Sequence, residues 1–224
     1  MQHSDDSIRR EVEEELRYDP SLAEDDIAVS VRDGVVTLVG RVKSYLDKWH
    51  AERSASRVRG VRAIANDLDV RLPSTSSRKD TDIARAAADT LDWNIAVPKG
   101  RIKARVENGW VTLEGDVDWN FQKEAAERSV RSIAGVKGVT SLITVRVRPT
   151  PSDVKKKIAD ALERAAEFDA ERITVEVDGN KAILRGTVRS FAERRDAERA
   201  AFNAPGITEV ENRLLVNPNV PAVV

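Results

Sequence analysis

Apolar positions recur along this chain in a pattern that predicts one structural unit, present three times. In the first unit Ile8, Val12 and Leu16 recur at helical spacing, and residues 27–31 then alternate between apolar and polar as a strand does. A second strand, a second helix and a third strand follow. The same series of patterns starts again 75 residues later, and once more after a further 71 residues. A repeat of this length indicates tandem copies of one small domain.

The order of elements predicts an α+β fold made of three tandem α-β-β-α-β domains. Their expected boundaries are residues 4–72, 78–148 and 150–218, with polar or proline-containing linkers between them. About 70 residues are enough for a two-layer domain in which both helices cover one face of a three-stranded sheet. A domain of that size buries a modest fraction of its surface, so contacts between domains are also expected.

Helix starts are expected at residues whose side chains can cap a helix. The predicted N-caps of the first and second helices are Asp6, Thr81, Ser152, Ser44 and Ser190. The middle copy departs from this pattern because Trp119 stands where the other two copies have serine, so a neighbour such as Asp118 is needed to cap its second helix. That helix is expected to bury Phe121 in its apolar stripe.

Glycines mark three recurring positions in each copy. Asp33-Gly34 and Asn108-Gly109 are two-residue hairpin turns, and the third copy has the inverted pair Gly179-Asn180. We interpret the recurrent glycines as structural, at a turn, a strand corner and a helix end. They are Gly34, Gly40, Gly60, Gly109, Gly115, Gly135, Gly179, Gly186 and Gly206. A phosphate-cradling glycine loop is disfavoured because no glycine cluster leads from a strand into a helix with a lysine nearby.

These residues together resemble the BON domain, named for bacterial osmotically inducible and nodulation proteins. The carrying pattern in the middle copy is Gly109-x-Val111-x-Leu113-x-Gly115, then Ala126-Glu127-Arg128, then Gly135-Val136. The resemblance implies an α-β-β-α-β fold with a mixed sheet, no known catalysis and no cofactor. It also implies an association with osmotic or envelope stress and a proposed affinity for phospholipid surfaces.

The residues that catalysis needs are scarce in this sequence. There are no cysteines and two histidines, His3 and His50, which are far apart in sequence and form no recognisable nucleophile or metal cluster. Asp116 and Asp118 supply fewer oxygens than a calcium loop requires. We therefore expect a protein that is not an enzyme, with no catalytic, cofactor-binding or metal-binding residues. The net charge of −1 gives no overall field that would attract nucleic acid.

Neither a membrane span nor an export signal is evident in the sequence as written. No apolar run approaches the roughly 18 residues needed to cross a bilayer. The first six residues are polar and acidic and lack the basic and apolar regions of a signal peptide. The expected location is therefore cytoplasmic, or periplasmic if a signal was removed.

Charge and tryptophan distinguish the middle copy from the other two. The net charges of residues 4–72, 78–148 and 150–218 are −3, +3 and −1, and three of the four tryptophans lie in the middle copy. The strand alternation predicts that Trp110 points from the open face of the sheet, together with Lys103 and Arg105. Trp119 follows just beyond the corner at Gly115.

Two hypotheses account for these departures from the repeat. In the first, the middle domain binds an anionic phospholipid surface through Trp110, Trp119, Lys103 and Arg105, because aromatic and basic residues together suit such an interface. In the second, the protein is an interaction or self-assembly scaffold, with the tryptophans buried between domains or subunits. Binding of nucleic acid is disfavoured, since Glu107 and Glu114 interrupt the basic patch. The sequence leaves the oligomeric state open.

Overall fold

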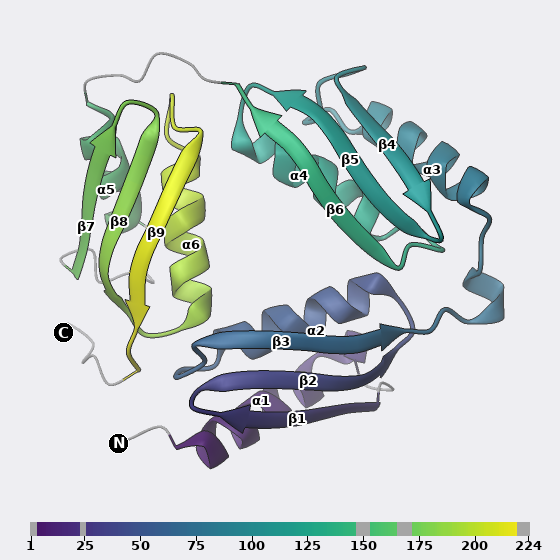
Figure 1. Ribbon diagram of the computed structural model, residues 1–224, viewed down its shortest axis with the longest axis horizontal. Coiled ribbons are helices and arrows are strands. Elements are labelled where there is room, and N and C mark those ends of the chain that lie inside the picture. The colour runs from purple at the N-terminus through teal and green to yellow at the C-terminus, as the bar shows by residue number, and fades with distance from the viewer. Residues whose placement is uncertain (1–3, 23–25, 147–152, 165–171, 219–224) are drawn as a thin grey trace. The chain divides into compact units, whose positions relative to one another are not determined.

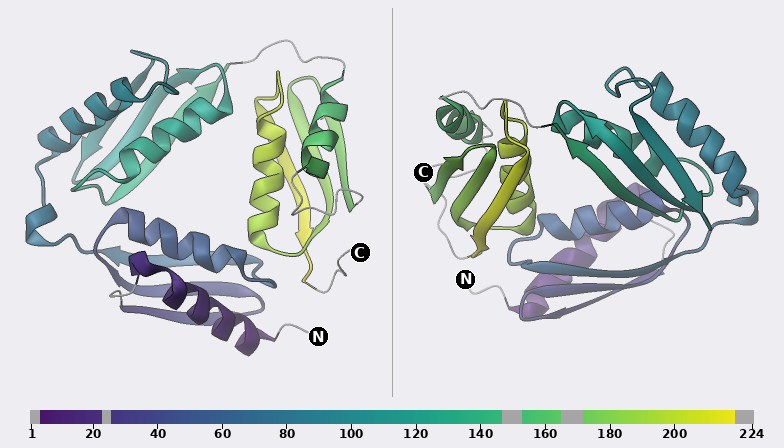
Figure 2. Two further views of the ribbon diagram at one scale, coloured as in Figure 1. Left: turned by 180° about the vertical axis from the view of Figure 1, so that it is seen from behind. Right: turned by 45° about the horizontal axis from the view of Figure 1, so that its top comes forward.

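The computed structural model describes residues 4–22, 26–146, 153–164 and 172–218, and it contains three copies of one α+β unit (Figure 1). The described residues form three sheets of three strands each, in the orders β1-β2-β3, β4-β5-β6 and β7-β8-β9. In each copy the two helices lie on the same face of the sheet (Figure 2). The predicted fold class and order of elements are confirmed.

The bounds of the helices and strands follow the repeat closely. The first domain consists of α1 (Asp5–Tyr18), β1 (Asp26–Arg32), β2 (Val35–Val42), α2 (Tyr45–Arg57) and β3 (Ala63–Val70). The middle domain consists of α3 (Asp80–Trp93), β4 (Ile102–Glu107), β5 (Trp110–Val117), α4 (Asn120–Arg131) and β6 (Gly138–Val145). The third domain consists of α5 (Val154–Arg164), β7 (Ile173–Asp178), β8 (Lys181–Val188), α6 (Phe191–Phe202) and β9 (Glu209–Val216). Single 3₁₀ turns occupy Pro20–Leu22 and Ser74–Ser76.

Each sheet is mixed because its central strand has one antiparallel and one parallel neighbour. In the middle domain β4 and β5 form an antiparallel hairpin in which Val106 lies opposite Val111 and Ala104 opposite Leu113. The chain then crosses through α4, and β6 pairs with β5 in parallel, with Val139 opposite Val111. A parallel pair requires such a crossover, which explains why the second helix separates the last two strands. The third sheet has the same pairing.

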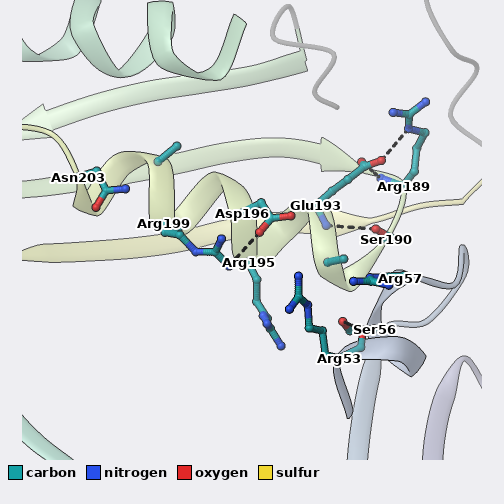
Figure 3. Close-up of a pocket in the computed structure, with 12 residues that line it drawn as sticks. Arg53, Ser56, Arg57, Arg189, Ser190, Glu193, Arg195, Asp196, Arg199 and Asn203 are labelled. Carbon is teal, nitrogen blue, oxygen red and sulfur yellow. Dashed lines mark hydrogen bonds and ion pairs between the residues drawn. The ribbon is translucent and has the colours of Figure 1, made fainter. Parts of the chain in front are cut away.

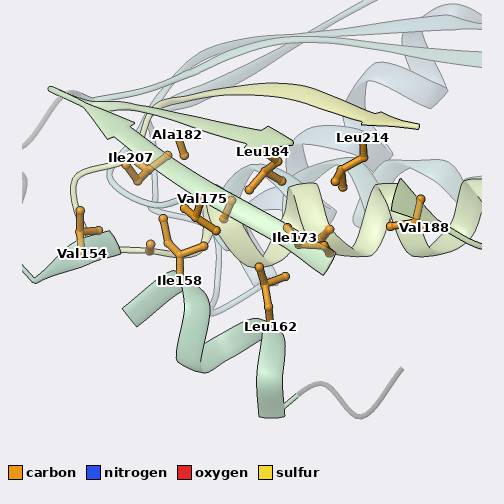
Figure 4. Packing of buried hydrophobic residues seen from close by; sticks show 13 residues of the cluster. Val154, Ile158, Leu162, Ile173, Val175, Ala182, Leu184, Val188, Ile207 and Leu214 are labelled. Carbon is orange, nitrogen blue, oxygen red and sulfur yellow. The ribbon is translucent and has the colours of Figure 1, made fainter. Parts of the chain in front are cut away.

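The core of each domain lies between its helices and its sheet. In the middle domain Ile83, Val111 and Leu113 are buried, together with Ala126 and Val130 from α4. The third domain repeats this arrangement, with Ile158 of α5 and Leu184 of β8 packed together (Figure 4). The apolar stripes read from the sequence are therefore core positions, with one exception. Phe121 lies exposed in the first turn of α4, so the prediction that the helix buries it was wrong.

All nine recurrent glycines have positive φ angles. At the corner of the middle domain, Gly115 has a φ of 143°, and a Cβ there would collide with the carbonyl oxygen of Arg101. Gly186 has the same relation to Arg172 in the third domain. The backbones of the first two strands approach so closely at this corner that only glycine fits.

The second helices of the outer domains begin as predicted. The hydroxyl of Ser44 accepts a hydrogen bond of 3.1 Å from the backbone N–H of Asp47. Ser190 caps α6 in the same way, accepting from Glu193 at 3.1 Å, while the Glu193 carboxylate accepts from Arg189 (Figure 3). Both serines fill the N-cap role that their residue type favours.

The first helices begin earlier than predicted. The N-cap of α1 is Ser4, whose hydroxyl accepts from Ser7 N–H at 3.2 Å, and the N-cap of α3 is Lys79, which makes no side-chain capping bond. The predictions of Asp6 and Thr81 were therefore wrong. The reason is that an aspartate at the first helical position is bonded to the hairpin turn, as described below. Ser152 and His3 lie outside the described residues.

Among the helices that the structure describes, none combines the length and the apolar character needed to cross a membrane.

Candidate functional site on the middle domain

The hairpin turn of the middle domain is held by the start of α3. The Asp80 carboxylate accepts hydrogen bonds from the backbone N–H groups of Asn108 at 2.7 Å and Gly109 at 2.9 Å. Because both N–H groups point at one carboxylate, the turn is fixed to the helix. The site that begins at Trp110 is therefore built on a rigid corner of the domain.

The first domain repeats this contact, which the sequence interpretation missed. Asp5 accepts from the N–H groups of Asp33 and Gly34 at 2.8 and 3.0 Å. The available signal was that Asp5 and Asp80 are 75 residues apart, the same offset as the two turns. The third copy has Pro151 at the corresponding position and also has the inverted turn, so the aspartate and the turn order change together.

Lys103, Arg105 and Trp110 lie on the open face of the middle sheet. All three side chains are exposed, and they alternate with core-facing residues along β4 and β5. Arg105 lies opposite Thr112, and Lys103 lies opposite Glu114. The structure thus confirms that the two cations and the tryptophan share one face, and it places Glu107 directly opposite Trp110 on that face.

The indole of Trp110 lies over Gly138, its partner residue on β6. A Cβ at Gly138 would collide with the ring, and the indole N–H donates a hydrogen bond of 2.8 Å to the Thr140 hydroxyl. The side chain remains 50% exposed. It is therefore a fixed aromatic platform with its polar atom satisfied, and it presents one ring face to solvent. Gly138 and Thr140 were not identified from the sequence, although the parallel register places a residue without a side chain opposite the tryptophan.

The third domain fills the corresponding three positions with charged residues. Lys181, which corresponds to Trp110, forms ion pairs of 2.8 and 2.9 Å with Glu209 and Glu211. Hydrogen bonds from Arg213 and then from Lys181 lower the pKa of Glu211 from 4.5 to about 2. The Lys181 pKa is raised, chiefly by its hydrogen bond to Glu209. One backbone therefore carries an aromatic platform in one copy and an ionic cluster in another.

Trp119 lies at the other end of β5 from Trp110. It is the N-cap residue of α4 and is half-buried. Trp110 is the first residue of β5 and Trp119 lies just beyond its last residue, Val117, so the strand alone, seven steps of about 3.3 Å, separates them by roughly 23 Å. The structure therefore does not bring the two tryptophans together.

The cap of α4 is supplied by Gln122. Its side-chain oxygen accepts from the backbone N–H groups of Asp118 at 3.0 Å and Trp119 at 3.1 Å. The Asp118 carboxylate instead accepts a hydrogen bond of 2.8 Å from Arg101. A glutamine at the third helical position, a recognised part of the capping box, was the signal in the sequence.

Asp116 is the centre of an ionic corner formed with Arg101 and Arg146. Hydrogen bonds from Arg101 and then from Arg146 lower the pKa of the Asp116 carboxyl. The carboxylates considered as calcium ligands therefore have arginine partners. Within the described ranges, no three His, Asp or Glu side chains gather as a metal site would require. His50 lies on α2, with its Nδ1 3.8 Å from the Asp19 carboxylate.

Two further apolar side chains project from the middle domain without having been assigned a role. Trp93, the last residue of α3, is 83% exposed, and Ile95 in the following loop is 102% exposed. Asn94 holds this loop, donating to the Ser129 hydroxyl at 2.7 Å and accepting from Ala96 N–H at 2.9 Å. Tyr18, at the same position of the first copy, is 85% exposed. An exposed aromatic residue at the end of the first helix is thus a feature of two copies.

Comparison with known proteins relates all three copies to one family. The model of the BON domain matches residues 4–71, 79–147 and 151–218. The chain is 31% identical over 139 residues to the osmotically-inducible protein Y of Escherichia coli (strain K12), an alignment that covers 60% of this chain and 69% of that protein. Among solved structures, the C-terminal domain of CdsD, a structural protein of the type III secretion system of Chlamydia trachomatis, is 15% identical over 93% of this chain and 96% of that one. The TM-score of this match is 0.27.

Proposed function

The chain belongs to the BON-domain family, and on that premise we propose that it is a non-enzymatic, osmotic-stress-associated protein whose middle domain binds anionic phospholipid surfaces. The association with stress is supported by its similarity to osmotically-inducible protein Y. We propose a lipid surface as the ligand of the middle domain. The residues that support this proposal lie on the open face of β4 and β5.

The single observation behind this proposal is that Lys103, Arg105 and Trp110 share that face. Lys and Arg near an anionic bilayer each contribute about 1 kcal/mol to binding, and tryptophan favours the level of the headgroups. Of the three repeat regions, only the middle one has a positive net charge. The half-exposed indole is already ordered against Gly138, so it loses little conformational freedom when it binds.

Trp119 remains part of the proposed site as a separate contact. Because it lies at the far end of β5 and is half-buried, it cannot insert at the same point as Trp110. We therefore expect Trp110→Ala to weaken binding more than Trp119→Ala does. Equal binding of anionic vesicles by the wild type and the Trp110→Ala/Trp119→Ala double variant would show that neither tryptophan belongs to the binding site.

The test is co-sedimentation with vesicles of phosphatidylglycerol and phosphatidylcholine, compared with phosphatidylcholine alone. Lys103→Ala/Arg105→Ser introduces the residues of the first copy, Ala28 and Ser30, which the fold accommodates. We expect about 30-fold weaker binding, from about 2 kcal/mol for two cations. The matched control is Lys155→Ala/Lys156→Ser on α5, which removes the same charge from exposed positions of another domain. Failure of the wild type to bind the anionic vesicles overturns the proposed function.

An interaction scaffold is the second candidate, and the exposed Trp93, Ile95 and Tyr18 favour it. Asp89 and Asp92 lie exposed near Trp93 on α3, which suits a basic protein surface better than an anionic membrane. Light scattering after size-exclusion chromatography distinguishes the two. A self-associating wild type that becomes monomeric on Trp93→Ser/Ile95→Ser supports the scaffold, as does tryptophan emission that is blue-shifted without lipid and unchanged by it.

A further inference from the structure

The turn end of the middle domain contains a surface pocket that the open face does not include. It has a volume of about 470 Å³ and lies between the start of α3, the Asn108-Gly109 turn and the loop that leads into β6. Volumes of this order accommodate small ligands. Three cationic side chains, from Arg78, Lys79 and Lys137, line it.

One backbone hydrogen bond beside the pocket recurs in all three copies. Lys137 N–H donates to the Gly109 carbonyl at 2.9 Å, and the equivalent bonds join Arg62 to Gly34 at 2.8 Å and Thr208 to Asn180 at 2.9 Å. The side chains differ between the copies. Where the middle copy has Arg78, Lys79 and Lys137, the first has His3, Ser4 and Arg62, and the third has Pro149, Thr150 and Thr208. The concentration of cations is therefore specific to the middle domain.

Contacts position Arg78 and Lys137, and the three cations of the lining outnumber its one carboxylate. One terminal nitrogen of Arg78 donates to the carbonyls of Thr75 at 2.7 Å and Ser77 at 2.9 Å, which fixes the guanidinium. The stem of Lys137 lies close over Gly109, in space that a larger residue would need. Asp80 is the one carboxylate that lines the pocket, and its two oxygens already accept the N–H groups of the turn. The pocket therefore presents three cations against one carboxylate that is already hydrogen-bonded.

We infer that this pocket binds the phosphate group of a lipid headgroup, with Arg78, Lys79 and Lys137 as its ligands. The occupant is argued from the neighbouring residues. Gly109 is followed by Trp110, and Lys137 by Gly138, so the pocket and the half-exposed indole lie at the same end of the sheet. A phosphate joined to an apolar body matches a cationic pocket beside an aromatic platform. That the phosphate belongs to a lipid rests on the proposed function. That the pocket binds a phosphate group rests on the pocket alone.

The test replaces the lysines with residues that other copies carry. Lys79→Ser introduces the residue of the first copy, which also provides a capping hydroxyl for α3, and Lys137→Thr introduces that of the third copy. The double variant is therefore expected to fold. Lys99→Ser/Lys123→Thr removes the same charge elsewhere in the middle domain and is the matched control.

Two measurements on the full chain give the answer. Titration with inorganic phosphate, at constant ionic strength, is expected to shift the amide NMR signals of Gly109 and Gly135 in the wild type and the control, and not in Lys79→Ser/Lys137→Thr. Binding of that variant to phosphatidylglycerol vesicles is expected to fall about tenfold or more relative to the control.

The outcomes separate this inference from the proposed function. Vesicle binding by the double variant that equals the control, with no phosphate shifts in the wild type, overturns the inference and leaves the proposed function standing. Phosphate shifts together with unchanged vesicle binding overturn the lipid headgroup as the source. If the wild type binds no vesicles, the proposed function and the lipid source both fail, and the titration alone decides whether the pocket holds phosphate.

Discussion

The Asp80 carboxylate accepts a hydrogen bond of 2.9 Å from the backbone N–H of Gly109, 29 residues further along the chain. A second bond, from Asn108, makes the contact bidentate. The contact joins the first turn of α3 to the tip of the hairpin, and both the aromatic platform and the cationic pocket begin at that tip. The geometry of the candidate site therefore depends on Asp80, which lines the pocket and lies outside the platform.

Asp80→Ala is expected to destabilise the middle domain by about 2 kcal/mol, because it leaves two backbone N–H groups without their charged acceptor. Urea unfolding followed by the NMR signals of this domain measures the change. Asp82→Ala is the control, since it removes a carboxylate from the same helical turn and is not bonded to the hairpin. Equal losses in the two variants would mean that the effect is one of helix charge alone.

Gly138→Ala is expected to displace the indole of Trp110 and break its bond to Thr140, at a cost of about 1 to 3 kcal/mol. The first copy has Val35, Ala63 and Ala65 at the corresponding positions. Adding Trp110→Val and Thr140→Ala to Gly138→Ala should therefore recover most of the lost stability, as measured by thermal unfolding and near-ultraviolet circular dichroism. Additive losses across this series would contradict the packing described for the platform.

Gly115→Ala is expected to destabilise the middle domain by about 2 kcal/mol or more, since its φ of 143° and the nearby Arg101 carbonyl leave no room for a side chain. Gly100→Ala provides a comparison, because its φ is also positive but its surroundings are open. The difference in urea midpoint between the two variants measures the collision together with the larger backbone strain at a φ of 143°. A difference of zero would contradict both the collision and the additional strain.

The stability of the third domain should fall in acid partly through Glu211. The pKa of this group is lowered in the folded protein from 4.5 to about 2, so its contribution is complete above about pH 4.5 and is lost as the pH falls towards 2. Glu211→Gln is expected to make the decline in unfolding free energy over this range less steep. Urea titrations at several pH values measure the slope, and parallel curves for the variant and the wild type would refute the assignment.

Much of the fold follows from the sequence because the information is periodic. The stripe of Ile83 on α3, the alternation around Val111 and the spacing of the glycines each repeat with the domain, and each was read correctly. Residues that depend on contacts between distant elements were missed. Asp80 meets a turn 28 residues away, and Gly138 is recognisable only after the register of β5 and β6 is known.

The candidate site was predictable only in part, for a related reason. Alternation along a strand placed Trp110, Lys103 and Arg105 on one face, since that depends on local geometry alone. Trp119 was grouped with them although the length of β5 separates it from Trp110. The pocket residues Arg78 and Lys137 lie on loops far apart in sequence, and no periodic pattern joins them.

The residue equivalent to Trp110 and its two neighbours on the next strand differ among the three copies. This difference has a consequence for how the protein can be altered. An aliphatic set, an aromatic set and an ionic set occupy equivalent places on the same backbone, and each set is complete within two neighbouring strands. A surface of this kind can be transplanted whole. Moving the indole, its glycine and its threonine onto the first or third copy should relocate the aromatic platform, and duplication within one chain offers a route by which a shared scaffold acquires different surfaces.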